Sequence, residues 1–163
     1  MKQARAKPPL VDVVDPAKRS EMMAGIGAKN TKPELVVRRI LHRFGYRFRL
    51  HRKDLPGKPD IVLPKWKTVI FVHGCFWHGH LDCPIFRLPK SRTEFWETKI
   101  KGNQDRDTRR RLEYRHSDWT MLEVWECALK GRGKLSVSEF ADQLKLAIET
   151  GKGIPKEIRG HTQ

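Results

Sequence analysis

One short segment of the chain is unusually rich in side chains that bind metals or transfer protons. Residues 73–83 contain three histidines, two cysteines and an adjacent phenylalanine and tryptophan. The apolar run of residues 69–72 leads directly into this segment. Such a pattern is typical of a buried strand that ends in a functional loop. We therefore expect metal binding and acid–base chemistry at one edge of a sheet.

Part of this segment has the spacing of a closed zinc site. Cys75, His80 and Cys83 form the pattern C-x4-H-x2-C, and Cys127 follows another apolar run much later in the chain. Structural zinc takes four sulfur and nitrogen ligands in a tetrahedron. The alternative is that Cys127 is an ordinary buried cysteine, unrelated to the other two. Spacing alone leaves three candidates for the ligand that is not sulfur: His78, His80 and Asp82.

A second, open site could use the histidines that zinc leaves over. Asp60 follows a proline at the start of a short apolar run, next to the turn of residues 55–59. A carboxylate in such a place suits Mg²⁺, which keeps waters and can hold a substrate phosphate. His73 or His78 could then take or give the proton, because a histidine titrates near neutral pH.

Each of these acid–base residues also has a structural explanation. Asp60 could cap a turn, and His73 could be a hydrogen-bonded core histidine. Glu34 occupies the last position of a helix capping box, and Asp107 could be a solvated partner in an arginine-rich helix. Three histidines within eight residues, in a basic chain, favour the catalytic interpretation for the histidines.

Two pairs of aromatic residues flank the candidate site. Phe76 and Trp77 lie within the loop, and Phe95 and Trp96 follow it. Aromatic side chains in a basic, polar loop can stack on nucleic-acid bases or wedge into a base step. Core packing is the alternative, which we favour for Phe95, whereas Phe76 and Trp77 fit insertion equally well.

The composition indicates a polyanionic partner. The 163 residues include 34 Lys and Arg against 19 Asp and Glu, so the formal net charge is +15. A charge this large repels itself unless a negative partner neutralises it. A ribosomal or histone-like protein would share the charge, but not usually five tryptophans and a Cys/His cluster.

The cellular location is expected to be cytoplasmic. The N-terminal stretch is basic, but the apolar segment of a secretory signal does not follow it. No apolar run is long enough to span a membrane as a helix. Three cysteines make a poor disulfide framework and suit a metal site with reduced thiols better.

The pattern of residues predicts one α/β domain with two basic extensions. Residues 1–14 are expected to be a flexible basic arm, residues 15–150 a single domain, and residues 151–163 a frayed basic tail. Helices are predicted from residue 15 to about 25, over 31–44, from a cap at Thr93, over 103–116, and after the capping box of Ser136 and Glu139. Strands are predicted over 46–50, 60–63, 68–72 and 120–125, with 68–72 central.

Several of these motifs together resemble the very-short-patch-repair (Vsr) mismatch endonucleases. The similar segments follow one another in order: HGCFWH at 73–78, RTEFW at 92–96, N at 103, RD at 106–107 and VWEC at 124–127. LPGKPD at 55–60 fits the same pattern, as do KRS at 18–20 and two methionines at 22–23. The resemblance extends over about residues 15–134.

This resemblance implies a fold and an activity. The fold is restriction-endonuclease-like, an α/β structure whose mixed central sheet is flanked by helices, with a structural zinc site. The activity is Mg²⁺-dependent nicking of one DNA strand 5′ to the T of a T:G mismatch, the lesion left when 5-methylcytosine deaminates. The partner is then double-stranded DNA, mismatch-repair proteins could assist, and the enzyme is expected to be a monomer.

The resemblance also implies roles for individual catalytic residues. Asp60 and the backbone carbonyl of Val72 match the Mg²⁺ ligands. His73 and His78 match the catalytic histidines, with His78 as the general base. Asp107 matches an acidic residue that supports the histidines, and a carboxylate near the catalytic centre corresponds to Glu34.

The remaining implied roles concern zinc and DNA. The zinc ligands would be Cys75, His80, Cys83 and Cys127. The DNA contacts would be Phe76, Trp77, Trp96, Met23 and Arg19. Two other hypotheses stay open: a non-catalytic, zinc-stabilised DNA-binding module, and a related nuclease with a different substrate.

Overall fold

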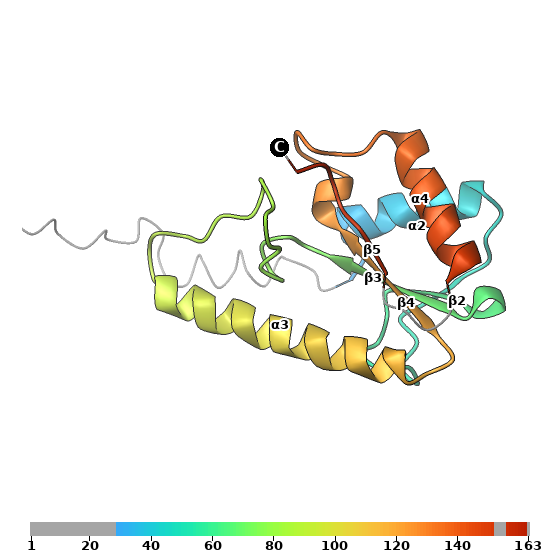
Figure 1. Cartoon of the computed structure of the whole chain (residues 1–163), viewed down its shortest axis with the longest axis horizontal. Helices are drawn as coiled ribbons and strands as arrows, with labels where there is room; N and C mark the ends of the chain where they lie inside the picture. Colours follow the sequence, from blue (N-terminus) through green and yellow to red (C-terminus); the bar gives the residue numbers. More distant parts are fainter. Residues whose placement is uncertain (1–28, 152–155, 163) are drawn as a thin grey trace, which may run out of the picture.

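The computed structural model describes residues 29–151 and 156–162 of the chain (Figure 1). Its regular elements surround a sheet of five strands in the order β1-β2-β3-β4-β5. The strands are β1 (Arg49–Leu50), β2 (Ile61–Leu63), β3 (Thr68–His73), β4 (Thr120–Trp125) and β5 (Lys156–Ile158). The first three strands are antiparallel neighbours, whereas β4 and β5 run parallel to β3, so the sheet is mixed.

Three long helices cover the two faces of this sheet. They are α2 (Lys32–Arg43), α3 (Thr93–Arg115) and α4 (Val137–Thr150), and two short 3-10 turns, η1 (Pro64–Trp66) and η2 (Glu126–Ala128), follow β2 and β4. In Figure 1, α3 runs along one side of the sheet while α2 and α4 lie on the other. The predicted α/β class with a mixed central sheet and flanking helices is therefore confirmed.

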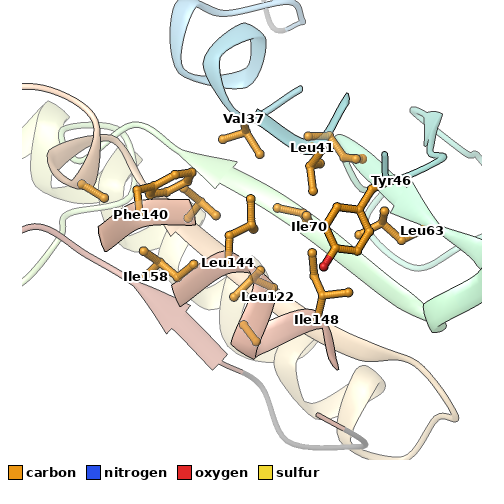
Figure 2. Packing of buried hydrophobic residues seen from close by; sticks show 14 of the residues in the cluster. Val37, Leu41, Tyr46, Leu63, Ile70, Leu122, Phe140, Leu144, Ile148 and Ile158 are labelled. Atoms are coloured by element: carbon orange, nitrogen blue, oxygen red, sulfur yellow. The ribbon is translucent and has the colours of Figure 1, made fainter. Parts of the chain in front are cut away.

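The larger hydrophobic core lies between the sheet and the pair α2 and α4. Figure 2 shows Ile70 and Leu122 of the sheet packed with Leu41 of α2 and Leu144 of α4. The opposite face carries a smaller cluster in which Tyr114 of α3 packs on the sheet. Because successive strand residues point to opposite faces, Phe71 and His73 of β3 lie on the α3 side.

Local signals in the sequence located several elements correctly. The capping boxes of Thr31 with Glu34 and of Ser136 with Glu139 both form, and they begin α2 and α4. β3 is the central strand, and β4 has the predicted bounds. The strand predicted over residues 46–50 is shorter, since only Arg49–Leu50 pairs with β2.

α3 corrects the prediction of two separate helices between residues 93 and 116. Thr93–Arg115 is one helix of 23 residues, and it passes through Gly102. A glycine in a helix interior costs about 1 kcal/mol relative to alanine, which packing along the helix can outweigh. Trp96, Ile100 and Tyr114 supply that packing as buried residues of α3. The predicted cap is also wrong, because Arg92 is the N-cap and Thr93 is the first helical residue.

The C-terminal segment corrects the prediction of a frayed tail. Lys156–Ile158 forms β5 and pairs in parallel with residues 122–124 of β4. Ile158 is 1% exposed and belongs to the larger core. A three-residue strand with one buried apolar side chain has no periodic signal that sequence analysis could detect.

Residues 1–28 lie outside the described part of the chain. They include the predicted arm of residues 1–14, the helix predicted from residue 15, and the predicted DNA contacts Arg19 and Met23. Among the helices that the structure describes, none combines the length and the apolar character needed to cross a membrane.

Candidate functional site

The loop after β3 brings four ligand-type side chains together. The donor atoms of Cys75, His80, Cys83 and Cys127 all lie within 4.8 Å of one another. Nδ1 of His80 is 3.5 Å from Sγ of Cys75 and 3.5 Å from Sγ of Cys127. The geometry therefore selects His80 over His78 and Asp82 as the fourth member of the cluster.

The cluster has the chemistry and dimensions of a tetrahedral zinc site. Zinc–sulfur and zinc–nitrogen bond lengths imply a sulfur–nitrogen separation of about 3.6 Å between two ligands of one tetrahedral ion. The two separations of 3.5 Å match this value. Hydrogen bonding between Cys75 and Cys127 raises the pKa of the Cys75 thiol and lowers the pKa of the Cys127 thiol. A bound cation would take the place of the remaining thiol protons.

Neighbouring elements hold this cluster from two sides. The His80 ring stacks on Trp125 at the end of β4, with ring centroids 3.8 Å apart and planes 3° apart. Trp125 in turn donates a hydrogen bond from Nε1 to Glu157 of β5 at 3.1 Å. The guanidinium of Arg159 donates to the carbonyl of Leu81 at 3.0 Å. The segment that was predicted to fray therefore supports the metal-type cluster.

α3 fixes the backbone on both sides of His78. Nδ2 of Asn103 donates to the carbonyl of Trp77 at 2.6 Å, and Nε2 of Gln104 donates to the carbonyl of Gly79 at 3.1 Å. Gly79 has φ of +55°, and a Cβ there would lie 2.5 Å from Ile100 of α3. The loop can approach the helix this closely only because residue 79 is glycine.

We predict opposite effects for the same substitution at two glycines. Gly79→Ala is expected to lower the free energy of unfolding by about 1–3 kcal/mol, because it combines a clash with a left-handed backbone. Gly102→Ala is expected to raise it by up to about 1 kcal/mol, because a Cβ there meets nothing within 4 Å. Denaturant unfolding of both variants measures the difference. A Gly79→Ala variant as stable as Gly102→Ala would contradict the proposed close approach of loop and helix.

His78 is held by a carboxylate from α3. Its Nδ1 lies 2.6 Å from Oδ2 of Asp107, which is 2% exposed. Burial opposes ionisation of Asp107, but the hydrogen bond from His78 and nearby positive charges outweigh it and lower the pKa of the carboxyl. One of these charges is Arg110, whose Nη1 is 3.1 Å from Oδ1 of Asp107. An ionised carboxylate only accepts hydrogen bonds, so Nδ1 of His78 carries a proton and Nε2 is the basic nitrogen.

His73 lies directly beside His78, with ring centroids 4.0 Å apart. Its Nε2 is 3.0 Å from Oε1 of Glu123, a buried residue of β4. Burial is the main reason why the pKa of His73 lies below its ordinary value, so the ring favours its neutral form. The two imidazoles therefore form a closely packed pair, each hydrogen-bonded to a carboxylate.

Asp60 is positioned at the start of β2 by the neighbouring strand. Its Oδ2 accepts a hydrogen bond from the amide of Val72 at 2.8 Å. Burial raises the pKa of Asp60 to about 6; the Val72 amide partly opposes this rise, and the negative charge of Glu34 adds to it. Glu34 is itself 2% exposed and paired with Arg38 at 2.7 Å. Asp60 is thus a carboxylate that the fold leaves short of positive charge, which a hard cation could supply.

The two candidate sites differ in the metals they suit. His73, His78 and Asp107 also have ligand atoms within 4.8 Å of one another. One nitrogen of each ring already bonds a carboxylate, at 3.0 Å in His73 and 2.6 Å in His78, and Mg²⁺ prefers oxygen ligands. This group therefore suits proton transfer better than metal binding, whereas the sulfur-rich cluster suits zinc.

The aromatic residues form one continuous group beside the loop. Phe76 packs edge-on against Trp77 and Trp96, with ring centroids 5.1 and 5.3 Å apart. Trp96 is buried, at 8% exposed, whereas Phe76 and Trp77 are partly exposed. The prediction that Phe95 belongs to the core is wrong, because it is 46% exposed and lies under the guanidinium of Arg92.

Sequence analysis missed three residues that complete the histidine pair. Glu123 and Arg111 bond each other beside His73, and Arg110 lies against Asp107 and over the Phe71 ring at 4.3 Å. The only available signal for Glu123 was a single acidic residue inside an apolar strand. Such a residue needs a buried partner, which the sequence alone could not identify.

Comparison with known proteins shows the family of this chain. The model of the family described as DNA mismatch endonuclease Vsr matches residues 11–84. The type II nicking enzyme V.XorIIP of Xanthomonas oryzae pv. oryzae is 50% identical over 126 residues, 77% of this chain and 92% of the relative. The DNA mismatch endonuclease Vsr of Escherichia coli K12 is 41% identical over 149 residues, 91% of this chain and 94% of the relative. This chain therefore belongs to the Vsr family of DNA mismatch endonucleases.

Proposed function

We propose that this protein nicks one strand of duplex DNA 5′ to the T of a T:G mismatch by Mg²⁺-dependent hydrolysis. The main support is the pair of adjacent histidines, each held by a buried carboxylate, together with Asp60, which bonds the amide of Val72, the residue before His73. The relatives named as a mismatch endonuclease and a nicking enzyme support the reaction class. We also propose that the mixed sheet is a variant of the restriction-endonuclease-like fold.

Each site residue then has a role in the hydrolysis. Bound at Asp60 and the carbonyl of Val72, Mg²⁺ would stabilise the charge of the phosphoryl transition state and acidify a bound water. His78 is the general base, since its Nε2 is free to take the proton of the attacking water while Asp107 stabilises the imidazolium. His73 lies beside it, and its unprotonated Nδ1 can accept a hydrogen bond from water in the site. Glu34 adds negative charge near Asp60 and so favours cation binding.

Other parts of the chain would bind the DNA. The net charge of +15 suits the phosphate backbone, and binding should weaken steeply with salt. Phe76 and Trp77, supported by the buried Trp96, would insert beside the mismatch. Zinc at the cysteine–histidine cluster would keep the loop that carries both His78 and these aromatics in place. Arg19 and Met23 are proposed DNA contacts on the strength of the family resemblance alone.

A strand-resolved nicking assay tests this function. We expect cleavage of the T strand alone in a duplex with one central T:G pair, only with Mg²⁺, and none in the T:A duplex. His78→Asn is expected to nick at least about 100-fold more slowly, because it loses the general base. Its matched control is His116→Asn, an exposed histidine at the end of α3, which should behave like the wild type.

The alternatives predict different results in the same assay. Tight, salt-sensitive binding without nicking, for every flanking sequence tried, would favour a non-catalytic zinc-stabilised DNA-binding module. Mg²⁺-dependent nicking that ignores the mismatch would favour a related nuclease with another substrate.

A further inference from the structure

Glu123 is an exception within the strand that carries it. β4 has the sequence TMLEVW, all six of its residues are buried, and Glu123 is 3% exposed. A buried carboxylate is strongly unfavourable unless it is paired and hydrogen-bonded. An apolar residue at position 123 would stabilise the sheet as well or better. The presence of a glutamate there therefore needs an explanation other than the stability of the sheet.

The carboxylate of Glu123 is fully engaged by two other elements. Nε of Arg111 donates to Oε2 at 2.7 Å, and Nη2 of Arg111 donates to Oε1 at 2.9 Å. The same Oε1 accepts from Nε2 of His73 at 3.0 Å. Burial opposes ionisation of Glu123, but the bonds from His73 and Arg111 outweigh it and lower the pKa of the carboxyl.

The register of the sheet explains how this contact forms. Glu123 lies opposite Phe71 in the parallel pair of β3 and β4, and His73 is two residues further along the same face. A long side chain reaches such a diagonal neighbour. Arg111 of α3 also donates hydrogen bonds to the Glu123 carboxylate. Three elements thus meet at the ring of His73.

The two histidines consequently bond their carboxylates through different ring nitrogens, His73 through Nε2 and His78 through Nδ1. The carboxylate of Glu123 can only accept, so Nε2 of His73 carries the proton and Nδ1 is the unprotonated nitrogen. His78 bonds Asp107 through Nδ1, which leaves Nε2 unprotonated. Each carboxylate is paired with an arginine of α3, Asp107 with Arg110 and Glu123 with Arg111.

We propose that Glu123, held by Arg111, is a positioning residue that fixes the orientation and tautomer of His73 and so presents Nδ1 as a hydrogen-bond acceptor in the catalytic site. The role in the reaction rests on the proposed nuclease function. Removing such a supporting partner typically lowers activity about 10- to 100-fold. Glu123 acts through His73, so DNA binding should not depend on it.

The test compares two double variants that differ only in the acceptor offered to His73. Glu123→Leu/Arg111→Met removes both charges and the acceptor, and it leaves no buried charge unpaired. Glu123→Gln/Arg111→Met also removes both charges but keeps an amide oxygen for Nε2 of His73. Arg109→Met, an exposed neighbour on α3, controls for the loss of one positive charge.

Two measurements decide the outcome. We expect the Leu/Met variant to lose about 10- to 100-fold in kcat with KM for DNA close to that of Arg109→Met, and the Gln/Met variant to recover most of the loss. The second measurement is NMR of protein in which the histidines carry ¹⁵N. The downfield, slowly exchanging Nε2 proton of His73 should disappear in the Leu/Met variant and remain in the Gln/Met variant.

Equal kcat values for the two double variants would overturn the proposal, and so would an unchanged Nε2 proton signal in the Leu/Met variant. The spectra do not require nicking. If the wild type nicks no DNA, the proposed function fails, while the proton signal still decides whether Glu123 holds the ring of His73.

Discussion

Asp60→Asn is expected to abolish nicking and, at the same time, to raise the melting temperature of the protein measured without added Mg²⁺. Loss of the metal ligand should slow cleavage at least about 10³-fold, because a bound metal contributes several kcal/mol to transition-state stabilisation. The gain in stability has a separate cause. The folded protein keeps the ionised Asp60 carboxylate largely desolvated and close to Glu34, and asparagine removes that charge while its side-chain oxygen can still accept a hydrogen bond from the amide of Val72.

The pH dependence of this gain follows from the direction of the pKa shift. Folding raises the pKa of Asp60 from 3.8 to about 6. The ionised carboxylate therefore destabilises the folded state fully above pH 6, and the penalty fades as pH falls toward the unfolded pKa. We expect Asp60→Asn to be more stable than the wild type by about 1–3 kcal/mol at pH 7.5, and by about half of that at pH 5.

Denaturant unfolding of the zinc-loaded protein at these two pH values measures the gain. Asp118→Asn is the matched control, because the Asp118 side chain is 88% exposed and should give almost no change. Addition of Mg²⁺ should stabilise the wild type and not Asp60→Asn, because only the wild type retains the ligand. A variant that is no more stable than the wild type at pH 7.5, or that still nicks, would contradict the assignment of Asp60.

The parts of the fold that the sequence predicted correctly depend on local interactions. The capping box of Thr31 and Glu34 joins residues three apart, so its pattern is visible before anything is known of the tertiary structure. The apolar run of β3 indicated a strand buried on both faces, and β3 is indeed central. The spacing of the cysteines predicted a metal-type set and the family resemblance specified His80 as its histidine; the structure brings these four residues within 4.8 Å.

The parts that the sequence did not predict depend on contacts between distant elements. Glu123 and Arg111 are twelve residues apart on different elements, and neither has a motif of its own. β5 is stabilised by the burial of Ile158 in the larger core and by the hydrogen bond that Trp125 donates to Glu157. Spacing alone did not separate His80 from His78; the family resemblance selected His80, and the structure places its Nδ1 3.5 Å from Sγ of Cys75 and of Cys127.

The zinc-type cluster connects β4 and the C-terminal segment to the loop that carries His78. Cys127 lies just after β4, and the other three ligands lie in the loop that also carries His78. The amide of Gly160 donates to Sγ of Cys127 at 3.4 Å, so the C-terminal segment meets the loop at the same point. Removal of the metal should therefore release the loop, and with it His78, from the sheet.

Cys127→Ala is accordingly expected to lose its zinc, to unfold more easily by at least about 4 kcal/mol, and to lose nicking although Cys127 contacts no substrate. The loss arises because three remaining ligands hold zinc weakly, and the loop is then attached only through side-chain contacts such as the hydrogen bonds from Asn103 and Gln104. Metal analysis and denaturant unfolding measure the first two effects. His161→Ala, whose side chain is 61% exposed and lies outside the cluster, should retain one equivalent of zinc and normal stability.

Zinc titration separates loss of the metal from loss of a well-packed cysteine. Wild-type protein stripped of zinc should resemble Cys127→Ala in stability, and returning zinc should restore the wild type alone. Cys127→His offers a fourth ligand of another kind and should recover part of the zinc affinity, because imidazole also binds tetrahedral zinc. If Cys127→Ala kept a full equivalent of zinc and its stability, the cluster would not be the structural metal site, and the loop that carries His78 would have to be held by its contacts with α3, Trp125 and Arg159.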